Sequence, residues 1–113
     1  MALPHAAPGE AIQIRRAGED LTRFCSTALV KTEEFELIRM VLPQGKSMPE
    51  HSVRGALTLL CLEGRIAVGA HAPFQHLNAG EMLYLNGGEV HSLCALQDAL
   101  VLLTILLGPA PRR

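Results

Sequence analysis

Few side chains in this sequence could do chemistry near neutral pH, and histidines are the most versatile of them. Imidazole can bind a divalent metal, act as a general base, or accept a hydrogen bond from a ligand. His51 and His91 are the first candidates, and Gly87-Gly88 predicts a turn that would deliver His91 to the mouth of a barrel. A structural role, with each ring hydrogen-bonded in an apolar interior, is the alternative.

Composition argues against several kinds of partner. The chain has ten basic and eleven acidic residues, a net charge of −1, and no basic run longer than two residues. Binding a phosphate backbone needs clustered cations, so we expect no nucleic-acid partner. The longest apolar run, residues 99–107, falls short of the roughly 20 residues that span a bilayer, so we expect no membrane segment. With no leader-like start and three cysteines without a CxxC pattern, we expect a cytoplasmic protein with reduced thiols.

The elements that would position these side chains are short strands. A chain of 113 residues suits one domain, so we expect a flexible N-terminal arm over residues 1–11 and one β-barrel domain over residues 12–108. Short apolar stretches bounded by Gly, Pro, Asn or Asp predict an all-β chain whose sequential strands pair through tight turns. The predicted strands are residues 12–15, 22–30, 35–42, 55–63, 65–70, 74–77, 82–85, 90–95 and 99–107.

Two of the predicted strands are apolar on both faces. Residues 57–62 and 100–107 do not alternate between apolar and polar side chains, which is typical of a strand covered on both sides. One face would fill the barrel and the other would meet a second sheet or a second subunit, so we expect a homodimer. A helix over residues 100–107 is the alternative, but the segment is short and lacks a good cap.

Two stretches partly match a pair of spaced motifs. The first has the form G-x5-H-x-H-x3-E-x6-G, and the chain keeps Gly45, His51 and Gly64 at its offsets. Val53 stands at the second histidine position and Leu57 at the glutamate position.

The second motif has the form G-x5-P-x-G-x2-H-x3-N, and the chain keeps Gly80, Gly88 and His91. Asn86 replaces the proline and Ala95 the asparagine. With these matches the sequence resembles a small single-domain member of the RmlC-like cupin superfamily. The four motif glycines, Gly45, Gly64, Gly80 and Gly88, are expected at reversals where a positive φ is needed.

The resemblance implies an antiparallel double-stranded β-helix, or jelly-roll barrel. In metal-binding cupins the two motifs supply the ligands, which places His51 and His91 at ligand positions and aliphatic side chains at the other two. Residues 51, 53 and 57 share one strand parity and should all point inward. A divalent metal (Zn, Fe, Mn, Ni or Cu) would therefore find an incomplete ligand set, a degenerate metal site, and we expect no cofactor. Cys61, of the same parity, is the one thiol that could add a ligand.

Three functions remain open. The favoured one is a binding module for a small-molecule ligand, with a mostly apolar pocket. The candidate pocket residues are His51, Val53, Leu57, Cys61, Tyr84 and His91. The alternatives are a metal-dependent oxygenase or isomerase that uses His51 and His91, and a metal-free, epimerase-type proton transfer with a histidine base and Tyr84 as the acid. His71 and His76 are expected to be exposed turn histidines.

Overall fold

The computed structural model describes residues 5–70 and 73–108, and this part of the chain forms strands but no helix. The strands are β1 (Cys25–Lys31), β2 (Phe35–Leu42), β3 (Ser47–His51), β4 (Leu57–Glu63), β5 (Arg65–Gly69), β6 (Gln75–Asn78), β7 (Met82–Leu85), β8 (His91–Ala95) and β9 (Ala99–Leu106). The all-β prediction is confirmed, and the helix considered for residues 100–107 is not formed. Within the described residues, no helix could cross a membrane.

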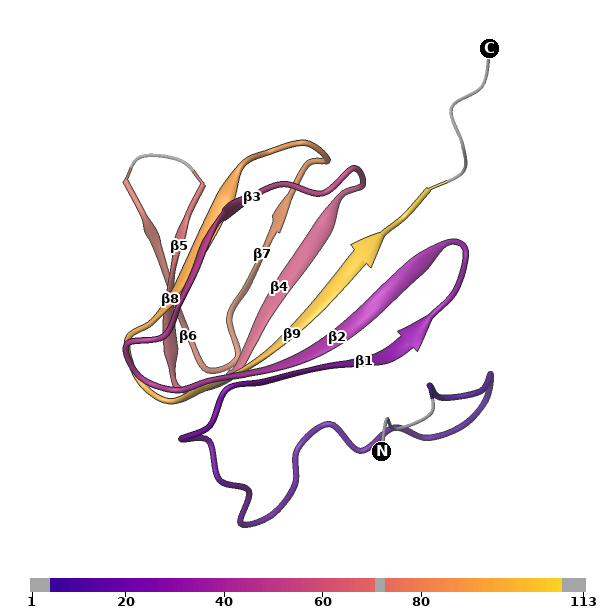
Figure 1. Ribbon diagram of the computed structural model, residues 1–113, viewed down its shortest axis with the longest axis horizontal. Helices are drawn as coiled ribbons and strands as arrows, with labels where there is room; N and C mark the ends of the chain where they lie inside the picture. The colour runs from indigo at the N-terminus through magenta and orange to yellow at the C-terminus, as the bar shows by residue number, and fades with distance from the viewer. Residues whose placement is uncertain (1–4, 71–72, 109–113) are drawn as a thin grey trace.

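The strands form two sheets that face each other (Figure 1). Sheet A has the order β1-β2-β9-β4-β7 and sheet B the order β3-β8-β5-β6, and every pairing is antiparallel. Sequential strands pair only at β1-β2 and β5-β6 in the described residues, so the prediction of sequential pairing is largely wrong. Most tight turns carry the chain from one sheet to the other, which is the jelly-roll arrangement.

The inward faces of the two sheets make one apolar core. Along β4 and β9 every second side chain is buried in it, and the members are Leu57, Leu59, Cys61, Ala99, Val101, Leu103 and Ile105. The four motif glycines lie at reversals with φ between 80 and 88°, as predicted. Gly64 has a further constraint, because a Cβ there would lie 2.1 Å from the carbonyl oxygen of Asp98.

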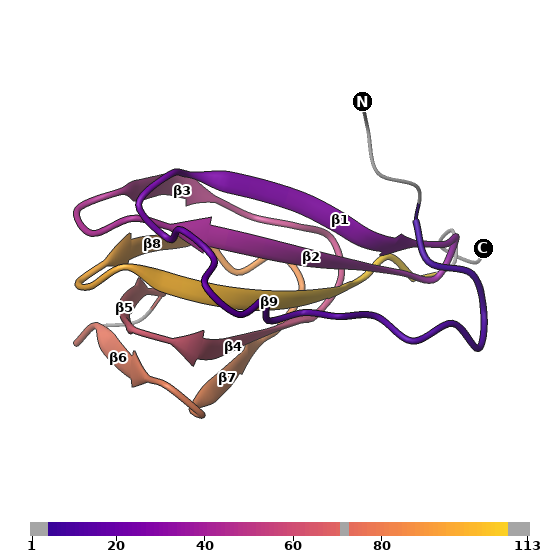
Figure 2. The same cartoon turned by 90° about the horizontal axis from the view of Figure 1, so that it is seen from below.

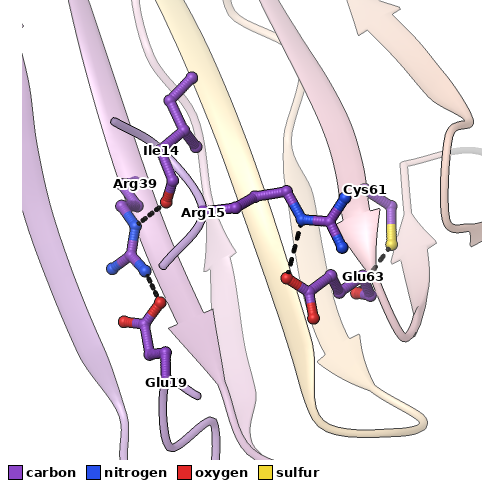
Figure 3. Close-up of polar contacts among 6 residues, drawn as sticks. All are labelled: Ile14, Arg15, Glu19, Arg39, Cys61 and Glu63. Atoms are coloured by element: carbon purple, nitrogen blue, oxygen red, sulfur yellow. Dashed lines mark hydrogen bonds and ion pairs between the residues drawn. The ribbon is translucent and has the colours of Figure 1, made fainter. Parts of the chain in front are cut away.

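The outward face of sheet A is partly covered by residues 5–24, which we call the N-terminal strap (Figure 2). Arg39, on the outward face of β2, is only 3% exposed, and its Nε donates to the carbonyl oxygen of Ile14 at 2.6 Å. Its guanidinium also forms an ion pair with Glu19, and Arg15 reaches Glu63 at 3.1 Å (Figure 3). The second apolar face of residues 100–107 is thus covered in part by the chain itself.

Two strand predictions are wrong. Residues 12–15 form no strand, because they belong to the strap and make no ladder with sheet A. Conversely, β3 was missed, because Ser47, Pro49 and Glu50 give it a polar sequence and it lies mostly exposed at the edge of sheet B. Ala6, in the predicted arm, donates its backbone N–H to the carbonyl oxygen of Leu29 in β1 at 2.9 Å.

Candidate functional site

His51 and His91 lie side by side on the inner face of sheet B. His51 ends β3, His91 begins β8, and the two residues are direct ladder partners. Their ring centroids are 4.4 Å apart, with the planes tilted by 54°. His91 alternates with Leu93 and Ala95, which are core residues, so its ring faces the interior. We call these two residues the histidine pair.

A β-bulge turns His51 inward. Met48 pairs with Leu93 and packs against the core, so it faces the interior. His51 follows three residues later, and regular alternation would point it to the outer face. The partner strand advances by only two residues over the same step, from Leu93 to His91, so β3 holds one extra residue. Both Met48 and His51 therefore face inward.

Backbone carbonyl groups fix how the two rings are presented. The Nδ1 of His51 lies 3.2 Å from the carbonyl oxygen of Pro49, and that of His91 lies 3.0 Å from the carbonyl oxygen of Glu89. A carbonyl oxygen only accepts, so each Nδ1 must donate. In the neutral ring this leaves the Nε2 lone pair available. His91 is 1% exposed whereas His51 is exposed, so one ring of the pair lies in the interior and the other lies at the surface.

Val53 and Leu57 lie close to the pair in sequence but not on a shared strand. β3 ends at His51, residues 52–56 form a loop, and Leu57 begins β4. The strand-parity argument for these positions is therefore wrong. Both side chains still face the interior, because Leu57 is a core residue and Val53 packs against the core. Being aliphatic, they offer no atom that could bind a cation.

Cys61 belongs to the core but not to the histidine end of the barrel. It lies four residues beyond Leu57 along β4, which is roughly 13 Å at the usual rise of a strand. Its Sγ donates to the carbonyl oxygens of Glu63 and Gly64, at 3.3 and 3.6 Å. Burial raises the pKa of this thiol, and the charge of Glu81 raises it further. Cys61 is therefore not placed to add a ligand beside the histidine pair.

Tyr84 points away from the interior. Its neighbours Leu83 and Leu85 face the core, and its ladder partner is Thr58 on the outward face of β4. The side chain is 65% exposed. The expectation that Tyr84 lines the pocket and serves a histidine as acid is therefore corrected, because strand alternation places it on the opposite side of sheet A.

Among the described residues, the donor set at the histidine pair is small for a metal ion. In the parts of the chain that the structure describes, no group of three or more His, Cys, Asp or Glu side chains could hold one. The histidine pair offers two donors, whereas catalytic metal sites typically use three protein ligands. His71 lies outside the described residues, and His76 is exposed on β6 with Nδ1 3.0 Å from Nη2 of Arg65.

A groove opens at the same end of the barrel, between the start of β2, the end of β9 and the loop after β3. Its volume is about 450 Å³, within the range of roughly 300–1,000 Å³ typical of ligand pockets. The lining residues of this mouth groove are Glu36, Val53, Arg54, Gly55, Ile105, Leu106, Leu107 and Gly108. Sequence reasoning named only Val53 among them. The sequence does mark Glu36, because it is the one charged residue at the apolar, inward-facing positions of β2.

Several known structures share this architecture, although comparison of the sequence with family models and curated proteins gives no match. A conserved Streptococcus pyogenes protein of unknown function is 18% identical, with 92% of this chain and 100% of that chain covered and a TM-score of 0.74. A cupin superfamily protein from Desulfitobacterium hafniense is also 18% identical, with 96% and 97% covered and a TM-score of 0.73.

A third match is an RmlC-like cupin from Desulfovibrio desulfuricans, which is 23% identical, with 93% and 97% covered and a TM-score of 0.69. At these identities the likeness bears on the fold alone. The chain has the fold of a small RmlC-like cupin, a double-stranded β-helix, as its two partial motifs implied.

Proposed function

We propose that this chain is a small-molecule binding module, with the histidine pair holding the polar end of the ligand. The supporting observation is that both Nδ1 atoms contact backbone carbonyl groups, which leaves the Nε2 atoms of two neighbouring rings as acceptors. Val53 and Leu57 supply apolar surface nearby. Two acceptors beside apolar walls suit a ligand that carries two adjacent hydroxyl or N–H donors on an apolar body.

Pinacol, a compact apolar molecule with two adjacent hydroxyl groups, is a suitable probe, and its dimethyl ether lacks the donors. We expect pinacol to shift the Nε2 resonances of His51 and His91 in proton–nitrogen NMR spectra of the imidazole rings, while the ether leaves them unchanged. Affinity would be in the millimolar range, because each hydrogen bond contributes only about 1 kcal/mol.

Two variants make this test specific. His91→Phe should abolish the response, whereas His76→Phe, which changes an exposed histidine on β6, should preserve it. Equal shifts with pinacol and its ether, or none with either, would contradict the proposal.

A metal-dependent oxygenase or isomerase is the competing function, and it needs a third donor from water or substrate. We expect protein purified without chelator or nickel resin to hold less than about a tenth of a metal ion per chain, because a dedicated site would be largely filled. Bound metal near one per chain that disappears in His51→Ala and His91→Ala would favour the enzyme. The geometry gives proton transfer through Tyr84 no support.

A further inference from the structure

The mouth groove places a carboxylate among apolar side chains. Glu36 has the inward phase of Ile38 and Met40 on β2, and its ladder partner is Ile105. Its side chain is 20% exposed. Val53, Ile105 and Leu107 provide apolar lining in the same groove. A carboxylate in such surroundings favours a ligand that brings a positive charge, because the charge would otherwise be poorly compensated.

The ion pair between Glu36 and Lys31 is a weak competitor for such a ligand. Nζ of Lys31 lies 3.9 Å from one carboxylate oxygen, at the limit of an ion pair, and the lysine side chain is 56% exposed. A long contact with a solvent-exposed lysine contributes only about 0–1 kcal/mol. A ligand ammonium group can therefore replace the lysine at Glu36 at little cost.

Arg54 brings the opposite charge to the same groove. It is exposed in the loop between β3 and β4, and no ion pair joins it to a carboxylate among the described residues. A guanidinium group binds a carboxylate with two parallel hydrogen bonds. Its long side chain can lie along apolar surface while the charged end stays in water.

From these three features we propose that the mouth groove binds a small zwitterion with an apolar body, the chemical class of the free apolar amino acids. The ammonium group contacts Glu36, the carboxylate contacts Arg54, and the apolar side chain lies against Val53, Ile105 and Leu107. Neither member of the histidine pair lines the groove, so this site does not depend on the function proposed above.

Three probes separate the two charges: leucine, leucinamide without the carboxylate, and isocaproate without the ammonium group. Titration calorimetry should show that Glu36→Gln weakens leucine and leucinamide about tenfold but leaves isocaproate unchanged. Arg54→Gln should weaken leucine and isocaproate and leave leucinamide unchanged. Glu50→Gln, at an exposed carboxylate on β3, and His91→Phe should change none of the three.

Lys31→Gln gives a prediction of opposite sign at an exposed position, where folding is not at risk. Removing the competing cation should tighten leucine and leucinamide binding severalfold and leave isocaproate unchanged. The proposal is overturned if leucine binds no better than its two fragments, if the effects of the variants do not follow the charges of the probes, or if Lys31→Gln weakens leucinamide.

Discussion

Arg39 holds the N-terminal strap to sheet A as a single buried charge. Its guanidinium contacts Glu19 and the backbone of Ile14, both of which precede the first strand. A buried cation needs its partners, since removing one leaves the charge uncompensated. Arg15 and Glu63 also join the strap to the sheet, but their side chains are 64% and 34% exposed, and ion pairs open to solvent contribute little.

Glu19→Ala should therefore lower the free energy of unfolding by about 2–3 kcal/mol. Arg15→Gln removes an ion pair between the same two parts of the chain and should cost less than about 0.5 kcal/mol. Urea denaturation of the three proteins checks both values. Similar losses in the two variants would show that Arg39 does not anchor the strap.

The histidine pair was predicted from the sequence, whereas Glu36 and Arg54 were not. The spacing of two partial motifs placed His51 and His91 together, and the ladder makes them partners. Glu36 and Arg54 follow no motif, and they line the same groove because β2 and the loop after β3 reach the same end of the barrel. Tyr84 was misplaced because sequence gives the alternation of a strand but not which face is inside.

Among the elements, long apolar strands were easier to predict than short polar ones. β2, β4 and β9 carry enough apolar residues to be predicted as strands from the sequence. β3 is mostly polar, and its conformation depends on pairing with β8. The order of the strands was beyond reach of local patterns, because partners such as β2 and β9 are distant in sequence. The predicted tight turns connect strands of different sheets, and local patterns do not distinguish such a connection from a hairpin.

The loop after β3 and the loop before β8 fit closely against their neighbours. A Cβ on Gly55 would lie 1.6 Å from the carbonyl oxygen of Leu106, and one on Gly87 would lie 2.1 Å from that of Arg54. Both obstacles are backbone atoms, which cannot rotate away. The close approach of the loop after β3 to Leu106 therefore helps to position residues 53–55, which line the mouth groove.

Gly55→Ala should destabilise the protein by at least about 1–3 kcal/mol, because the added methyl group forces the loop away from β9. Ser52→Ala, at an exposed position in the same loop, should stay within about 0.5 kcal/mol of the parent chain. Midpoints of urea unfolding provide the comparison. Equal midpoints for the two variants would mean that the loop adapts to the methyl group.

Considered as one body, the protein leaves part of the outward face of sheet A uncovered. Met82, Tyr84 and Leu106 are each at least half exposed there. The ion pairs of the strap reach Arg39 and Glu63 instead. A shallow groove of about 250 Å³ runs between Tyr84, Thr58 and Thr104. Exposed large apolar side chains beside an apolar groove are typical of protein interfaces. We propose that two copies of the chain associate through this patch.

Light scattering coupled to gel filtration should give twice the mass of one chain at micromolar concentration. Tyr84→Lys should produce monomers, because it buries a charge in the interface. Phe74→Lys changes an equally exposed aromatic beside Gly69 on sheet B and should leave the dimer intact. A parent protein with the mass of one chain would refute the dimer.

The position of β9 between β2 and β4 also determines when this protein can acquire its shape during synthesis. While the ribosome still holds residues 99–106, β2 and β4 each lack one neighbouring strand, and the core lacks the side chains that β9 contributes to it. Nascent chains therefore pass through a period in which apolar edges are open to other polypeptides. Stalled or prematurely terminated chains that lack β9 should be found in aggregates or bound to chaperones.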